Sequence, residues 1–324
     1  MIEILATGLL SSLQDQGRIG QAHLGIGRSG AADLPAMTLA NALVGNAPQA
    51  CALEMTLQGP RLRLHQSTTI ALAGAPMPKA SCNGVPLPMW RPVTCQAGSE
   101  IRFGAMRSGC RSYLAVAGGF DVEAWLGSRS TDLNAGLGPL GGRALREGDE
   151  LPLGPAGCVP GDPVHWSLDP GPWFNDDATP HVLRLLAGSH TPELDDASRQ
   201  ALETREFRIS ADSNRVGVRI QSDVPLKLRD HLELVSEGTV PGVMQLPPGG
   251  QPILLLNEHP VTGGYPRIAQ LAAVDLPRLA QCRPGDRLHF TWIKLEQAHA
   301  MFERSKQSLE LLMDQIARRL ENRE

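Results

Sequence analysis

Short apolar stretches separated by turn residues run through the first half of the chain. Apolar and polar residues alternate with period two in Arg61–Leu64 and in residues 100–103, which is typical of half-buried strands. Asn83-Gly84 is a hairpin turn signal. One helix is predicted among these strands, from about residue 34 to residue 44, because Asp33 is a favourable N-cap residue.

The second half of the chain repeats this pattern. Helices are predicted only at about 193–203 and 275–280. A turn followed by a strand recurs in similar form after Ala97, Glu147 and Pro284, which indicates related β hairpins in both halves and favours two barrel- or sandwich-like domains. Strands are predicted at 182–186, 207–210, 216–220, 242–246, 253–256, 268–274 and 288–293.

A segment rich in proline and glycine divides the two halves. Residues 154–181 contain six prolines and four glycines in 28 positions, which is the composition of a linker. The sequence therefore predicts an N-terminal β-rich domain at 1–153, a linker at 154–181 and a C-terminal β domain at 182–293.

The last segment, 294–324, has a different character. It contains six basic and six acidic residues, and its apolar residues recur at spacings of three and four, which predicts an amphipathic helix. We expect this helix to pack on the C-terminal domain, on a second copy through residues 295–320, or on a partner subunit. The apolar face consists of Leu295, Ala298, Phe302, Leu309, Leu312 and Ile316.

Composition and charge exclude several classes of protein. Thirty basic against thirty-four acidic side chains, with few aromatic residues, give no electrostatic footprint for nucleic acid. No apolar run is long enough to cross a membrane and no secretory signal is present, so we expect a cytoplasmic protein. The six cysteines form no Cys-x-x-Cys pair and no His-Glu-x-x-His occurs, so no metal site is expected.

Two arginines form the first candidate site. Arg215 and Arg219 flank Gly217 on a predicted strand, where side chains four residues apart share one face and lie about 13 Å apart. Such a gap suits a carboxylate or a phosphate. Two solvated arginines on an ordinary outer face are an equally weighted alternative.

The second candidate site follows the predicted strand 253–256. Glu258 and His259 place a carboxylate beside an imidazole, a combination that suits proton transfer. Thr262-Gly263-Gly264 offers backbone N–H groups to an anion, and Tyr265 would close the pocket. The alternative is a tight turn whose tyrosine only packs.

Glycine-rich segments supply the remaining candidates. Gly127-Ser128-Arg129-Ser130-Thr131-Asp132 combines hydroxyls with a guanidinium, so Arg129 and Ser130 are candidate phosphate ligands, with capping and turn chemistry as the alternative. Residues 25–30 match the glycine pattern of a dinucleotide fingerprint, but residues 136–141 match it too and no apolar strand precedes the first match. We therefore do not predict a Rossmann site.

An ordered set of motifs gives the chain a family resemblance. It includes Ser29-Gly30-Ala31-Ala32-Asp33 and Thr262-Gly263-Gly264-Tyr265-Pro266. With these motifs the chain resembles the family of the 5-oxoprolinase C subunit, also called allophanate hydrolase subunit 2 or the biotin-dependent carboxyltransferase B subdomain, over about residues 7–292. The other carriers are residues 8–10, 14–18, 40–46, 53–60, 113–119 and 127–131.

The resemblance implies a fold and an activity. It implies two cyclophilin-like β-barrel domains and a complex with homologues of the B and A subunits of 5-oxoprolinase, which opens 5-oxoproline to glutamate with ATP hydrolysis. It also adds Ser29 and Asp33 to the candidate binding residues and supports Arg215 and Arg219. Relatives differ, since one transfers carboxyl from carboxybiotin to urea and another antagonises a kinase inhibitor. This chain carries no biotinylation motif, so carboxyl transfer would require a separate carrier protein.

The sequence also departs from the family pattern at four site-proximal positions. Asn214 and Val218 replace a carboxylate and an aromatic residue around the two arginines, while Pro260 and Val261 replace glutamine and threonine before the Thr-Gly-Gly-Tyr-Pro motif. The resemblance therefore leaves open which substrate the chain's complex accepts.

Overall fold

The computed structural model describes residues 1–156, 164–169, 171 and 180–322. The chain forms two compact units. Unit 1 comprises Met1–Ile19, Ser29–Asp176 and Ser308–Glu324, and unit 2 comprises Gly20–Arg28 and Asp177–Gln307. Two segments do not follow the predicted domain limits at residues 153 and 182. Gly20–Arg28, near the N-terminus, belongs to unit 2, and Ser308–Glu324, at the end of the chain, belongs to unit 1.

The described strands of unit 1 form two sheets. For this part of the chain the sequence predicted a barrel or a sandwich. Each sheet has one apolar face, and packing these two faces together buries a core that includes Ile4, Leu53, Leu62, Leu72 and Leu114. The larger sheet has the order β11 (Glu150–Leu151), β1 (Ile2–Ala6), β4 (Arg61–Leu64), β9 (Glu100–Arg102), β6 (Ser81–Cys82), β7 (Val85–Pro86), and the smaller has the order β2 (Leu10–Gln14), β3 (Ala52–Thr56), β10 (Arg111–Val116), β5 (Thr68–Gly74), β8 (Pro92–Cys95).

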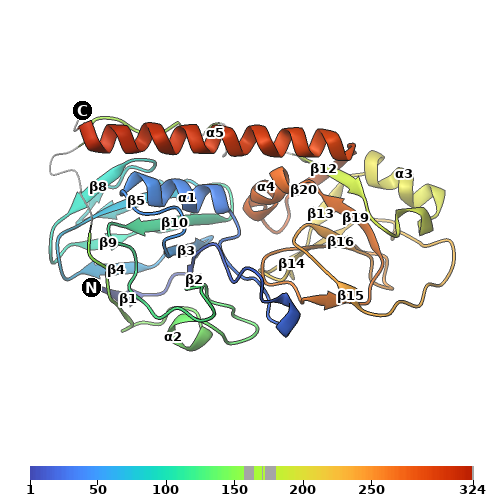
Figure 1. Ribbon diagram of the computed structural model, residues 1–324, viewed down its shortest axis with the longest axis horizontal. Helices are drawn as coiled ribbons and strands as arrows, with labels where there is room; N and C mark the ends of the chain where they lie inside the picture. Colours follow the sequence, from blue (N-terminus) through green and yellow to red (C-terminus); the bar gives the residue numbers. More distant parts are fainter. Residues whose placement is uncertain (157–163, 170, 172–179, 323–324) are drawn as a thin grey trace. The chain divides into compact units, whose positions relative to one another are not determined.

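Helix α1 (Leu34–Leu43) covers the outer face of the smaller sheet (Figure 1). The Asp33 carboxylate accepts a hydrogen bond from the Ala36 N–H, which confirms the predicted N-cap. Alternate residues of β5 are small on this side, Ala71 and Ala73, so the helix approaches the sheet closely. The predicted helix is therefore confirmed, and it forms a third layer on unit 1.

The predicted C-terminal helix is present as α5 (Leu295–Asn322). Within unit 1, Ile316 is buried against the α1 cluster, and Leu309 and Leu312 pack on the same cluster. The first part of the helix, to Gln307, belongs to unit 2, the C-terminal domain on which packing was expected, whereas the part from Ser308 onward belongs to unit 1, which the sequence did not predict. Leu295 and Phe302 remain 53% and 45% exposed.

Truncating Ile316 tests this packing. Ile316→Ala is expected to lower the free energy of unfolding by about 2 kcal/mol, because the side chain is buried on a helix that closes the α1 layer. Leu311→Ala is the matched control, since Leu311 lies on the same helix but is 64% exposed, and it is expected to change stability by less than about 0.5 kcal/mol. Equal effects in urea denaturation would contradict the assignment.

The predicted linker contributes to unit 1 where it is described. Trp166 and Leu168 pack on the α1 cluster, and the Leu168 N–H donates to the Trp90 carbonyl. The Arg319 guanidinium lies 5.6 Å from the centroid of the Trp166 ring. Other parts of the predicted linker, residues 157–163, 170 and 172–179, lie outside the described residues, as does Cys158.

The described strands of unit 2 form a closed barrel, and its members are the seven strands that the sequence predicted between residues 182 and 293. The interior holds large apolar side chains, among them Leu183, Phe207, Ile220, Leu254 and Phe290. No helix in the described part of the chain is long and apolar enough to cross a membrane. The barrel order is β12 (His181–Ala187), β19 (Arg267–Leu271), β16 (Val243–Gln245), β17 (Ile253–Leu255), β14 (Gly217–Gln221), β13 (Phe207–Ile209), β20 (Arg287–Trp292).

Shorter elements complete both units. A ribbon of β15 (Glu237–Gly238) and β18 (Thr262–Gly263) lies outside the barrel ladder. The remaining helices are α2 (Pro139–Gly142), α3 (Asp196–Thr204) and α4 (Leu276–Gln281), with 3-10 turns η1 (Ala22–Leu24), η2 (Thr191–Glu193) and η3 (Ala273–Asp275).

Candidate functional site

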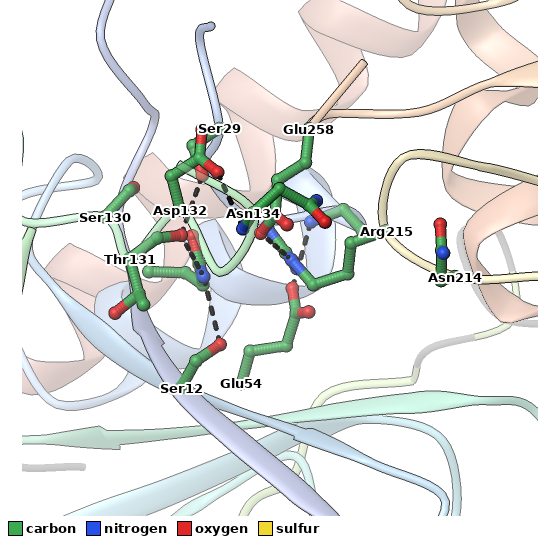
Figure 2. Close-up of polar contacts among 12 residues, drawn as sticks. Ser12, Ser29, Glu54, Ser130, Thr131, Asp132, Asn134, Asn214, Arg215 and Glu258 are labelled. Atoms are coloured by element: carbon green, nitrogen blue, oxygen red, sulfur yellow. Dashed lines mark hydrogen bonds and ion pairs between the residues drawn. The ribbon is translucent and has the colours of Figure 1, made fainter. Parts of the chain in front are cut away.

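A buried ion pair joins two neighbouring strands of the unit 2 barrel. Arg215 precedes β14 and Glu258 follows β17, and these strands are antiparallel with Gly217 opposite Leu255. The Glu258 N–H donates to the Arg215 carbonyl, so the backbone pairing continues past the strands. Arg215 Nε lies 2.5 Å from Glu258 Oε1, with both side chains buried (Figure 2). The register of the barrel thus brings together two residues that the sequence placed in separate candidate sites.

The prediction that Arg215 lies on a solvent-facing strand surface is wrong. Its side chain is 4% exposed, whereas Arg219, within β14, is exposed as predicted. The reason is that β14 begins only at Gly217, and Asn214 forms a turn before it by accepting the Val216 N–H at 2.8 Å. Strand alternation therefore does not extend back to Arg215, and the two arginines are not an open pair around one anion.

His259 follows Glu258 in the chain and is also buried. Its hydrogen bonds determine which ring nitrogen carries the proton. Nδ1 lies 2.8 Å from the Pro260 carbonyl and 2.9 Å from Thr239 Oγ1. A carbonyl only accepts, so Nδ1 carries the proton in the neutral ring and Nε2 keeps a lone pair. Burial lowers the pKa of His259, and the charge of Arg28 lowers it further, although the Pro260 hydrogen bond opposes them. His259 is thus a neutral base near pH 7.

Gln245 adds a buried hydrogen-bond donor at the end of β16. Its side chain is 4% exposed, and Nε2 has no hydrogen-bond partner among the described residues. A Cβ at Gly263 would lie 2.5 Å from this Nε2 and 3.4 Å from Thr239 Cγ2, so a larger residue at this position would displace the amide. A buried donor left unsatisfied is costly, which points to a ligand acceptor at this position.

Residues 262–265, the predicted binding loop near this amide, differ in their exposure to solvent. Gly263 is partly buried in the β15–β18 ribbon, whereas Thr262, Gly264 and Tyr265 are exposed. Tyr265 is therefore accessible on the surface of unit 2 and does not pack into its core.

In unit 1, the predicted serine cluster is occupied by internal hydrogen bonds. Ser128 Oγ and Ser130 Oγ both donate to Asp15 Oδ1, and the Arg129 N–H donates to Asp15 Oδ2 at 2.6 Å. The exposed Arg129 side chain donates to the Val122 carbonyl. These contacts are the capping and turn chemistry that the sequence left as the alternative to phosphate binding.

The two residues added by the family resemblance are also placed in unit 1. Ser29 is buried with a left-handed backbone and donates to the Thr131 carbonyl at 2.7 Å (Figure 2). Asp33 is the N-cap of α1, and its N–H donates to the Tyr113 hydroxyl. Both residues thus take part in hydrogen bonds within unit 1.

Sequence reasoning missed three members of the unit 2 cluster. Arg28 was noticed only within a glycine pattern, and Thr239 carries no motif. Gln245 had a detectable signal, because it is a polar residue inside the apolar stretch 242–246, where an amide must find a partner or a ligand. We refer to Arg28, Gln245, His259 and Thr239, with the Arg215–Glu258 pair, as the barrel cluster.

Comparison with known proteins identifies the class to which this fold and cluster belong. The family model described as carboxyltransferase domain, subdomain A and B, matches residues 24–292. The chain belongs to this family. Within it, the chain is similar to the 5-oxoprolinase C subunit of Escherichia coli, at 38% identity over 99% of both chains, and to that of Haemophilus influenzae, at 32% identity over 98% of both.

A solved structure gives the same fold in a different context. The crystal structure of Kluyveromyces lactis urea amidolyase matches with a TM-score of 0.87 and 27% identity, covering 97% of this chain but 20% of that one. Saccharomyces cerevisiae urea amidolyase is 30% identical over 99% of this chain and 18% of its own length. The family thus includes both short chains of this size and domains of much larger enzymes.

Proposed function

We propose that this chain is one component of an ATP-dependent 5-oxoprolinase complex that opens 5-oxo-L-proline to L-glutamate. The observation that supports the proposal best is the match to the 5-oxoprolinase C subunit of Escherichia coli, which is 38% identical and covers 99% of both chains. Homologues of the B and A subunits of 5-oxoprolinase would complete the catalytic unit, with ATP bound at the level of the complex.

The barrel cluster supplies groups that suit this reaction. Opening a stable lactam requires activation of its carbonyl oxygen, which ATP provides in the complex, and a base that takes a proton from the attacking water. His259 Nε2 is the proposed base, because Nδ1 is protonated and bonded to Pro260. The Gln245 amide is the proposed donor to a substrate oxygen, and the exposed Arg219 remains a candidate for the substrate carboxylate.

Glu258 has a positioning role in this proposal. Its carboxylate is held by Arg215, so its negative charge is balanced and it is not the free general base that the sequence suggested. The pair ties the end of β17 to the start of β14 and thereby fixes the backbone from which His259 projects.

A deletion experiment tests the function. Lysate from cells that lack this chain should lose 5-oxoproline-dependent ATP hydrolysis, and the full-length chain should restore it. Unchanged activity in the deletion lysate would overturn the proposal. Reconstitution with the homologues of the B and A subunits should then yield glutamate and ADP from 5-oxoproline.

Carboxyl transfer is the second candidate function, favoured by the urea amidolyase structure with its TM-score of 0.87. The same reconstituted complex would then carboxylate urea only when a biotinylated carrier protein is added. Turnover of neither substrate by the purified complex would favour a third function, in which the chain only sequesters a regulatory protein.

Gly263 provides a sharper test of the proposed substrate contact. Gly263→Ala places a methyl group 2.5 Å from the Gln245 amide nitrogen and displaces the amide, so it should lower kcat/KM for 5-oxoproline by about tenfold or more. Gly264→Ala is the matched control, because its Cβ would meet Ser236 Oγ at an ordinary 3.5 Å. Steady-state kinetics that give both variants the activity of the parent would remove Gln245 from the site.

A further inference from the structure

A second group of reactive side chains lies at one end of the unit 2 barrel, outside the barrel cluster. His181 is the first residue of β12, Cys282 caps the C-terminus of α4, and Asp286 directly precedes β20. β12 and β20 are parallel neighbours with His181 opposite Leu288, so the strand starts bring His181 next to the Cys282 to Asp286 turn. No sequence motif marks this group, because His181 is distant in the chain from the other two residues.

We propose that His181, Cys282 and Asp286 form a zinc site with three protein ligands. Their candidate ligand atoms all lie within 4.8 Å of one another. His181 Nε2 and Asp286 Oδ2 are 3.4 Å apart. Two ligands bound at about 2.0 to 2.1 Å in tetrahedral geometry are separated by about 3.4 Å, so this pair already has the spacing that zinc requires.

The donor types select the metal. A thiolate, an imidazole and a carboxylate together suit Zn²⁺, whereas Mg²⁺ and Ca²⁺ prefer oxygen ligands alone. Three protein ligands leave one tetrahedral position for water. Cys282 Sγ donates to the Arg278 carbonyl as a thiol, so metal binding breaks that hydrogen bond and releases the thiol proton to solvent.

The surroundings hold the ligands in place. Asp286 accepts the Arg283 N–H at 2.7 Å, which fixes the turn that carries the carboxylate. Cys282 is buried, while His181 and Asp286 are partly exposed, which leaves a route for the ion from solvent.

Cobalt titration of the full, chelator-treated chain tests this proposal. One equivalent of Co²⁺ should produce the visible bands of a tetrahedral ion and a thiolate-to-cobalt charge-transfer band, and Zn²⁺ should displace it. Cys282→Ser should abolish the charge-transfer band, and Asp286→Asn should weaken Co²⁺ binding by about tenfold or more. Thermal melting of the metal-free variants checks that each is folded.

His289→Ala is the matched control. His289 lies on β20 and pairs with Glu206 at 3.8 Å, so it offers an imidazole and a carboxylate on the same barrel with no thiol in that pair. It should leave the cobalt spectrum and the dissociation constant unchanged. The proposal is overturned if the parent chain gives no charge-transfer band, if the band survives in folded Cys282→Ser, or if His289→Ala weakens binding as much as Asp286→Asn.

Discussion

Arg215→Met is expected to lower the free energy of unfolding by about 3 to 5 kcal/mol, because it leaves the buried Glu258 carboxylate without the Arg215 charge. The double variant Arg215→Met, Glu258→Leu should recover most of this loss, since it removes both buried charges. Urea denaturation of the isolated chain measures both values, and together with the single variant Glu258→Leu they give the coupling energy between the two side chains.

Arg219→Met is the control for this prediction. Arg219 is a nearby arginine of the same segment, but its side chain is exposed, so its removal should change stability by less than about 0.5 kcal/mol. If Arg215→Met is as mild as Arg219→Met, the two arginines are equivalent, as the sequence alone suggested. A large loss of stability in Arg215→Met that the double variant does not recover would show that the loss comes from packing rather than from the unpaired charge.

The comparison between these arginines shows where strand patterns stop being informative. Periodicity located all seven strands of the barrel, because each has an apolar face that must enter one core. It could not place Arg215, because the turn at Asn214 comes directly before this residue and the strand begins only at Gly217. Element boundaries depend on such local hydrogen bonds, and these are weakly encoded in hydrophobic patterns.

The packing of α5 is a second feature that the sequence predicted only in part. The sequence predicted the helix, its apolar face and packing on the C-terminal domain, to whose unit the helix belongs as far as Gln307, but it did not predict that the part from Ser308 onward belongs to unit 1. Within unit 1, Leu309, Leu312 and Ile316 pack on the cluster that includes α1. Which of several apolar surfaces a helix covers depends on the arrangement of distant segments, and a single sequence does not report it.

The barrel cluster was predictable only in part for the same reason. Glu258 and His259 were singled out because acid and imidazole adjoin in the chain, yet the structure pairs Glu258 with Arg215 and His259 with Thr239 and Pro260. Two residues adjacent in the sequence thus have different roles. Glu258 balances the buried charge of Arg215, and His259 provides the unprotonated Nε2.

Removal of His259 Nε2 has the largest expected effect on activity. His259→Ala should lower the turnover of 5-oxoproline by the reconstituted complex by about a hundredfold, the usual contribution of a positioned base. The melting temperature should change little, because Thr239 Oγ1 keeps its hydrogen bond to the Pro260 carbonyl. His259→Asn should be equally inactive, since it offers a donor in place of Nδ1–H but no basic nitrogen. A loss below threefold in either folded variant would exclude His259 from the mechanism.

The pH dependence of the parent complex provides an independent check on the same residue. Burial and the charge of Arg28 both lower the pKa of His259, so the acidic limb of kcat/KM should fall below pH 6.5, the ordinary value for histidine. Arg28→Gln removes one cause of the lowered pKa. The pKa should therefore rise, and the acidic limb should move to higher pH. A limb that stays in place in Arg28→Gln would mean that another group titrates.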